Sequence, residues 1–246
     1  IKFGIPMDKS IEAQIDENGY GIIRGFIDKN RVERLSQLCE EVVEPREVKD
    51  YDGKALTTYG VSELIVKTRE LDDLITDPRL LSLSRSLIAT IDWWGMNLSD
   101  LSIKYVMPGQ DIRSLHRDDD VYPELSRAQP FTTNALLALD PFDEAVGATT
   151  VVPGSHRWDH PVDLNQETIS VEMDPGDLLM LSGRTWHGHG PNTTTDRRRR
   201  AINIYIIAGW LQTGHTAQFG MSEEEVAALP ESLRQLLVQG VSGERK

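Results

Sequence analysis

The sequence predicts a mainly β protein with flanking helices, in which two sheets pack face to face as a double-stranded β-helix, or jelly roll. Three observations support this prediction. Residues 91–210 carry short strand patterns separated by turn signals, residues 1–90 are mostly helical in pattern, and residues 222–238 return to a helix. Since no linker, repeat or low-complexity tract divides the 246 residues, we expect one domain with these three parts.

The N-terminal part is expected to contain helices and one strand. Residues 8–18 fit a short helix and residues 19–23 fit a strand. Asp28 is placed to cap a helix that runs to about residue 44. Residues 71–89 are expected to be helical with a break near Pro78, because proline lacks the N–H that a helix interior needs.

The stretch 45–70 is polar, rich in charged residues and punctuated by Gly53 and Gly60. Such a long connection is either disordered or a lid over a pocket. We expect residues 51–68 to contribute a wall of that pocket.

Eight strands are expected in the jelly-roll part, separated by Gly, Pro, Asn and Asp. Their ranges are 91–98, 101–107, 112–117, 131–139, 147–152, 168–173, 177–182 and 200–209. The C-terminal helix, 222–238, is expected to start at a capping box formed by Ser222 and Glu225.

Composition excludes several classes of partner. A net charge of −13 argues against nucleic acid and anionic membranes, because both repel a polyanion. No apolar stretch approaches the length of a membrane span. Cys39 is the single cysteine and lies on an apolar helical face, so we expect a core residue in a cytoplasmic protein. The sequence leaves both a monomer and a homodimer open.

Two segments far apart in the chain form a candidate metal site. His116 and Asp118 are two residues apart, so on a strand they point to the same face, with Asp119 on the opposite one. His187 and His189 also share a face, and either could supply a third ligand. Two imidazoles and one carboxylate are the facial triad of non-heme Fe(II) oxygenases. A jelly-roll enzyme that uses Zn(II) or Mn(II) for non-oxidative chemistry, and a sugar-binding jelly roll, are the alternatives.

A longer series of motifs carries a family resemblance. These are Pro108-Gly109, Leu115 to Asp119, Gly147-Ala148-Thr149, Val152 to His156, Pro175 to Leu178, His187 to Asn192, and an Arg before Ala201-Ile202. Over about residues 15–240 the chain resembles the phytanoyl-CoA dioxygenase family of Fe(II)- and 2-oxoglutarate-dependent oxygenases, with a cupin-like jelly roll. Its details are most similar to members that tailor natural products. A catalytically inactive, small-molecule-binding relative is a further alternative.

The resemblance implies that Fe(II) is held by His116, Asp118 and His187, since the family's distal ligand lies five residues before Asn192. It implies 2-oxoglutarate and O2 as co-substrates, with ascorbate as an auxiliary reductant. The retained carboxylate at Asp118 favours hydroxylation, desaturation or rearrangement over halogenation. The expected partner is a hydrophobic small molecule, with Trp186 and Trp93-Trp94 among its contacts.

The family also implies an arginine for the far carboxylate of 2-oxoglutarate. Strand register selects Arg199, whereas counting forward from the distal histidine selects Arg198. Alternation along the strand places Arg199 on the face with small and polar side chains, and Arg198 on the isoleucine-rich face. Thr149 is a candidate hydroxyl donor to the same co-substrate. Arg113 stands where relatives often have Gln, and it could supply a second cation.

Overall fold

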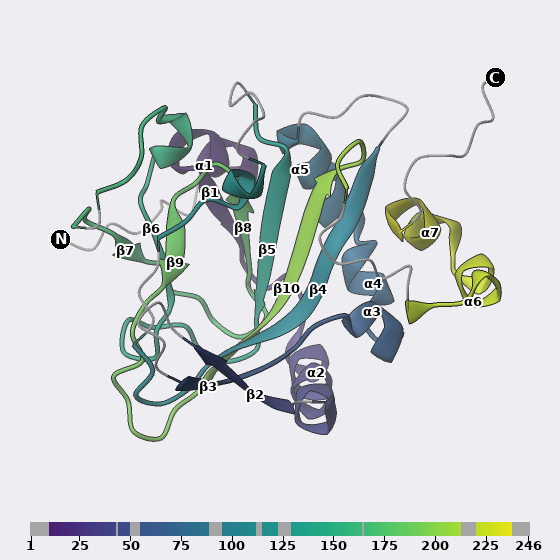
Figure 1. The fold of residues 1–246 in the computed structure, drawn as a ribbon, viewed down its shortest axis with the longest axis horizontal. Coiled ribbons are helices and arrows are strands. Elements are labelled where there is room, and N and C mark those ends of the chain that lie inside the picture. Colours follow the sequence, from purple (N-terminus) through teal and green to yellow (C-terminus); the bar gives the residue numbers. More distant parts are fainter. Residues whose placement is uncertain are drawn as a thin grey trace.

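The computed structural model describes residues 10–42, 44–49, 55–88, 95–111, 115–122, 129–163, 165–212 and 220–237. It contains two antiparallel sheets, as Figure 1 shows, so the expected jelly roll is confirmed. The large sheet has the order β1 (Tyr20–Ile23), β8 (Leu178–Ser182), β5 (Thr132–Ala138), β10 (Arg199–Ala208), β4 (Met96–Val106), β3 (Ala55–Val61) and β2 (Glu44–Lys49). The small sheet has the order β7 (Ile169–Ser170), β6 (Thr149–Val151) and β9 (His187–His189).

Two hydrophobic clusters form because the central strands are apolar on both faces. In β8, Leu178 and Met180 belong to a cluster with the helices, whereas Leu179 and Leu181 belong to a second cluster with the small sheet. Side chains alternate across a strand, so a continuous apolar run is what a strand covered on both sides requires. The large sheet therefore lies between a helical layer and the small sheet.

Several helices begin at a residue whose side chain caps the first turn. The helices are α1 (Ile11–Asn18), α2 (Lys29–Val42), α3 (Leu64–Lys67), α4 (Asp72–Ile75), α5 (Pro78–Leu87), α6 (Glu223–Ala228) and α7 (Glu231–Leu237). The Asp28 carboxylate accepts a hydrogen bond from the Arg31 N–H, which confirms the expected start of α2. Asp77 accepts from the N–H of Arg79, with Pro78 at the first helical position, where its missing N–H costs nothing. Among the described residues, we find no helix with the length and apolar character of a membrane span.

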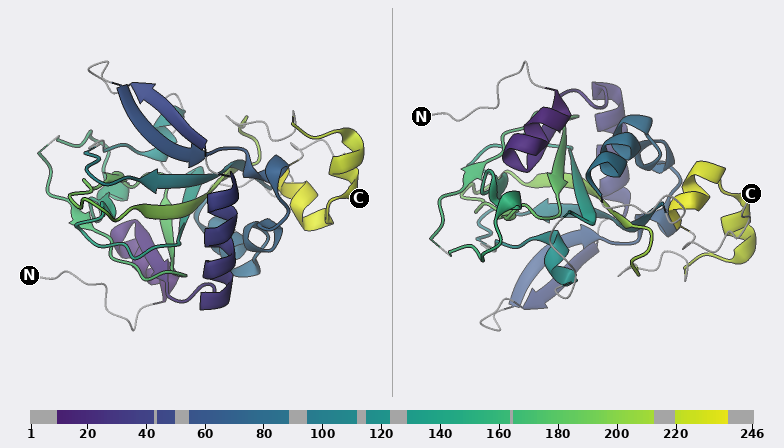
Figure 2. Two further views of the ribbon diagram at one scale, coloured as in Figure 1. Left: turned by 90° about the horizontal axis from the view of Figure 1, so that it is seen from below. Right: turned by 90° about the horizontal axis from the view of Figure 1, so that it is seen from above.

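The stretch 45–70 differs from the expected irregular connection. It forms a hairpin, β2 paired with β3, which extends the edge of the large sheet and projects from the body in Figure 2. Val61, Leu64 and Ile65 then enter the hydrophobic core that the helices share with the large sheet. None of the described residues 60–68 lines the cavity over the candidate metal ligands, so these residues contribute no wall to it. Residues 51–54 lie outside the described residues, and a lid in this stretch stays a prediction.

Two element boundaries also differ from expectation. The ranges 91–98 and 101–107 were expected as separate strands, but Met96–Val106 is one strand with a bulge opposite Tyr205–Ile206. The expected C-terminal helix is two helices, because Pro230 cannot continue α6. Its capping box is confirmed, with Ser222 and Glu225 each accepting the other's backbone N–H.

The arginines at the start of β10 have different partners. Arg200 is 9% exposed, and its guanidinium contacts Asp140 at 2.7 Å and Glu40 on α2 at 2.8 Å. Arg198 is more exposed, and its ion-pair partner among the described residues is Glu40. Arg200 therefore joins β10, the end of β5 and α2 in one ion-pair network.

We predict that Arg200→Ala lowers the free energy of unfolding by about 2–3 kcal/mol, because it leaves the mostly buried Asp140 without its cation. Arg198→Ala should cost less than about 1 kcal/mol, as expected for an exposed pair. Chemical denaturation of both variants measures the difference. Equal losses would contradict the assignment of the network to Arg200.

Candidate active site

Reciprocal main-chain hydrogen bonds bring the two histidine segments together. The His116 N–H donates to the His187 carbonyl at 2.9 Å, and the His187 N–H donates to the His116 carbonyl at 3.0 Å. This isolated antiparallel bridge places the two residues directly opposite each other. Asp118 follows at the start of a short 3-10 helix, Asp118–Val121. Backbone pairing thus brings the three side chains into one place.

The side chains of His116, Asp118 and His187 converge on a common point. One potential ligand atom from each lies within 4.8 Å of the others. Both Nε2 atoms are 3.7 Å from the Asp118 carboxylate, and the two rings are tilted by 50° with centroids 4.4 Å apart. This donor set, two imidazoles and one carboxylate, is the one that mononuclear non-heme iron prefers.

Neighbouring groups hold these side chains in position. Nδ1 of His187 lies 2.9 Å from the Thr185 carbonyl, so it carries the proton and leaves the Nε2 lone pair facing Asp118. Asn134 on β5 donates its amide N–H to Asp118 Oδ2 at 3.2 Å. His187 is buried, whereas the His116 side chain is 49% exposed.

A cavity of about 610 Å³ opens over this cluster. Polar side chains from β4, β5 and β10 line the face of the large sheet, and β6 and β9 close the opposite side. Its described lining residues are Ser99, Asp100, Lys104, His116, Asp118, Val121, Tyr122, Asn134, Leu136, Thr149, His187, Gly188, His189, Asn203, Tyr205 and Gln212. Asn203 and Tyr205 lie on the cavity side, as strand alternation predicts. The volume suits a small organic molecule together with a co-substrate.

Arg199 is fully buried beside this cavity. Its Nε and Nη2 donate to the Gly147 carbonyl, at 3.2 and 2.9 Å, and its guanidinium carbon lies 4.5 Å from the centroid of the Phe142 ring. Nη1 has no hydrogen-bond partner among the described residues. Burial lowers the pKa of Arg199 to about 10, so the side chain is still a cation at neutral pH. Arg198 points outward to Glu40, as expected for the opposite face.

His189 and Thr149 lie opposite each other across the small sheet and both line the cavity. Nδ1 of His189 is 3.1 Å from Nη2 of Arg199, so it accepts a hydrogen bond from the guanidinium. Burial and the Arg199 charge lower the pKa of His189 to about 3, which keeps the imidazole neutral. The Thr149 hydroxyl is buried and has no partner in the described part of the chain. Arg199, His189 and Thr149 thus form a polar pocket beside the candidate metal ligands. Two of its donors, Nη1 of Arg199 and Oγ1 of Thr149, lack a hydrogen-bond partner among the described residues.

The two acidic residues after Asp118 are not part of the cluster. They lie in a 3-10 helix, so strand parity does not apply to them. Asp119 is buried and accepts a hydrogen bond from Thr132 at 2.7 Å, and burial raises its pKa to about 6. Asp120 forms an ion pair with Arg117 at 2.9 Å.

Other expected site residues have different outcomes. Trp186 is buried, lies under the Arg117 guanidinium at 4.7 Å from the ring centroid, and does not line the cavity. Arg113 and Trp93-Trp94 lie outside the described residues.

Sequence analysis missed Asp100 and Lys104, which line the cavity from β4. The alternation of these polar residues with Leu101 and Ile103 was the available signal.

Comparisons with known proteins agree with this geometry. The sequence profile described as Phytanoyl-CoA dioxygenase (PhyH) matches residues 15–201. Multifunctional dioxygenase prhA of Penicillium brasilianum is 32% identical over 214 residues, covering 80% of this chain and 71% of prhA. The structure of SnoK, a non-heme alpha ketoglutarate dependent carbocyclase from nogalamycin biosynthesis, matches with a TM-score of 0.67 at 22% identity, covering 89% and 94% of the two chains. The epimerase SnoN, solved with Fe3+, alpha ketoglutarate and nogalamycin RO, matches with a TM-score of 0.63 at 20% identity and coverages of 96% and 95%.

The chain therefore belongs to the phytanoyl-CoA dioxygenase family. This membership confirms the jelly-roll fold and the enzyme class expected from the sequence, a non-heme dioxygenase that depends on Fe(II) and 2-oxoglutarate.

We predict that His187→Ala abolishes stoichiometric Fe(II) binding, because it removes one of three converging donors. His189→Ala is the matched control on the same strand and should retain the metal, since its imidazole faces Arg199. Metal analysis after anaerobic loading measures both. Retention of iron by the first variant and its loss from the second would assign the distal ligand to His189.

Proposed function

We propose that His116, Asp118 and His187 hold Fe(II) and that this enzyme oxidises a small organic molecule with 2-oxoglutarate and O2. The supporting observation is the convergence of these three donors at the wall of a cavity of about 610 Å³. When bound, the metal and co-substrate supply oxidation of a substrate C–H bond, with succinate and CO2 as co-products.

The protein's contribution to this reaction is to position the reactants. The Thr185 carbonyl holds the His187 tautomer, and Asn134 holds the Asp118 carboxylate in one orientation. Each contact lowers the conformational freedom of a candidate metal ligand, so the three donor atoms would bind the metal more tightly at the wall of the cavity.

Arg199 and Thr149 form the proposed site for the far carboxylate of 2-oxoglutarate. Each has a buried donor without a partner among the described residues, Nη1 of Arg199 and Oγ1 of Thr149. A buried cation with one unsatisfied N–H is unfavourable, and a carboxylate ligand would relieve that cost. His189 connects the cavity with the proposed anchor, because it lines the cavity and accepts a hydrogen bond from Arg199.

The substrate is expected to be mainly apolar. The cavity has apolar surface near the candidate metal ligands, which comes from Leu136, Tyr122 and the 66% exposed Val121. The relative prhA is described as a multifunctional dioxygenase, and SnoK and SnoN act in nogalamycin biosynthesis, which favours a natural product as substrate. Hydroxylation, desaturation and rearrangement are all open to this site. We also propose a cytoplasmic location, because the sequence has a single cysteine, Cys39, which is a buried free thiol.

We predict that Arg199→Ala weakens 2-oxoglutarate binding by roughly tenfold to a hundredfold, the size expected for loss of a charge-assisted hydrogen bond. Arg198→Ala, the adjacent and outward control, should leave binding unchanged. Calorimetric titration with 2-oxoglutarate measures both. Arg199→Met keeps the stem that packs on Phe142 and should reproduce the loss if folding is intact. Weaker binding by the Arg198 variant alone would reverse the assignment.

The class of reaction is tested by succinate formation. Wild-type protein with Fe(II), ascorbate, O2 and 2-oxoglutarate should form succinate slowly even without the natural substrate, because the co-substrate site is built independently of the substrate. Asp118→Ala should abolish this turnover, since it removes the only carboxylate of the described metal cluster. Absence of succinate together with absence of 2-oxoglutarate binding by the wild-type protein would refute the proposal.

A further inference from the structure

Strand β4 directs the acidic side chain of Asp100 into the cavity, next to a β-bulge. In the pairing of β4 with β10, Asp100 lies opposite Tyr205, but the next pair joins Leu98 to Ile206. Ser99 is therefore an extra residue, and both Ser99 and Asp100 line the cavity. Bulges of this kind re-aim side chains next to functional sites. Without the bulge, adjacent residues would point to opposite faces of the sheet.

The Asp100 carboxylate is only half satisfied. Oδ2 accepts hydrogen bonds from the Ser102 hydroxyl at 2.6 Å and the Asn203 amide at 3.1 Å, and the Lys104 ammonium lies 3.6 Å away. Oδ1 is buried and has no hydrogen-bond partner among the described residues. The side chain is 10% exposed, so water satisfies this oxygen poorly. An acceptor in this state is costly unless a ligand donates to it.

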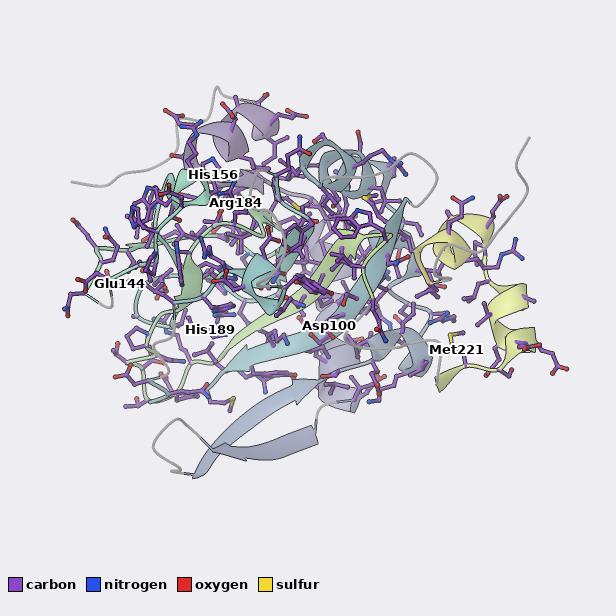
Figure 3. The ribbon with its side chains drawn as sticks, turned by 45° about the horizontal axis from the view of Figure 1, so that its top comes forward. Asp100, Glu144, His156, Arg184, His189 and Met221 are labelled. Carbon is purple, nitrogen blue, oxygen red and sulfur yellow. The ribbon has the colours of Figure 1, made fainter. Side chains whose placement is uncertain are left out.

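Asp100 lies far from the proposed co-substrate anchor. Its cross-strand partner Tyr205 is six residues along β10 from Arg199, which corresponds to about 20 Å of extended strand. Figure 3 labels Asp100 on β4 and His189, the hydrogen-bond partner of Arg199, at separate positions in the central part of the molecule. In addition, the carboxylate and ketone oxygens of 2-oxoglutarate only accept hydrogen bonds, so this co-substrate has no group that could donate to Asp100 Oδ1. The group that donates to Asp100 must therefore belong to the substrate.

We infer that Asp100 and Asn203 form a subsite that binds a hydroxyl group of the substrate. A carboxylate accepts but never donates, so it selects a hydrogen-bond donor. Lys104 already balances the Asp100 charge, and a second cation would be repelled by it, so a neutral donor fits best. The inference rests on the proposed function and deepens it, because the substrate becomes an apolar skeleton that carries a hydroxyl group.

The experiment compares two probes that differ in one group, 5α-androstan-3β-ol and 5α-androstan-3-one. The alcohol donates a hydrogen bond, whereas the ketone only accepts. Calorimetric titration of the full chain with Fe(II) and 2-oxoglutarate, without oxygen, should show the alcohol bound at least about tenfold more tightly, because a ketone leaves Asp100 unpaired. In Asp100→Asn the side-chain amide can donate or accept a hydrogen bond, so the alcohol and the ketone should bind with nearly equal affinity.

Asp72→Asn on α4 is the matched control. Asp72 also has a buried oxygen, Oδ1, without a hydrogen-bond partner in the described part of the chain. The Arg69 guanidinium lies 3.7 Å from that oxygen, and Asp72 does not line the cavity. This variant should keep the wild-type preference, and thermal unfolding verifies that both variants are folded.

No alcohol preference in the wild-type protein, including failure of either probe to bind, would overturn the subsite, as would an undiminished preference in Asp100→Asn. Binding of 2-oxoglutarate alone is measured in parallel. Alcohol preference without 2-oxoglutarate binding would overturn the proposed function and leave the subsite standing.

Discussion

The active site depends on one pair of main-chain hydrogen bonds, those between His116 and His187. They join segments 71 positions apart in the sequence and fix both imidazoles before any metal binds. Since the backbone determines where both side chains start, the remaining contacts need only orient them, and Thr185 and Asn134 do so. The geometry of the site is therefore determined by the pairing of the two backbone segments.

One face of the large sheet packs against the helices, and the other face lines the cavity. On β10, Ile202, Ile204 and Ile206 pack against the helices, while Asn203 and Tyr205 face the cavity. The tyrosine hydroxyl lies 3.4 Å from the Asp118 carbonyl, and burial raises the pKa of Tyr205 well above its ordinary value, so the group remains a neutral phenol. Because the two faces of β10 have different neighbours, its cavity side chains can vary without disturbing the hydrophobic core.

Much of this arrangement could be predicted from the sequence, and the exceptions have a physical cause. The spacing of His116 and Asp118 and the alternation around Arg199 are local patterns, so they predicted that candidate metal ligands converge and that one arginine points inward. Ser99 and Asp100 interrupt an apolar run, which predicted a turn, but they are a bulge in one continuous strand. A bulge is defined by the partner strand, so no local pattern reveals it. The hairpin of β2 and β3 was missed for the same reason, since its strands are specified by their place at the edge of the sheet.

The run of four arginines has a consequence for how the chain folds. If β10 paired with its neighbours one residue out of step, its isoleucines would face the small sheet, and Arg198 or Arg200 would occupy the enclosed position now held by Arg199. Moved in one direction, the strand brings Ala201 opposite Asp140, which then loses its guanidinium partner. Moved in the other direction, it brings Arg199 into the place of Arg200, so the ion pair can form again and only the isoleucines, now turned away from the helices, oppose that alignment. The run of arginines therefore disfavours one mispairing, and the hydrophobic pattern of the strand has to disfavour the other.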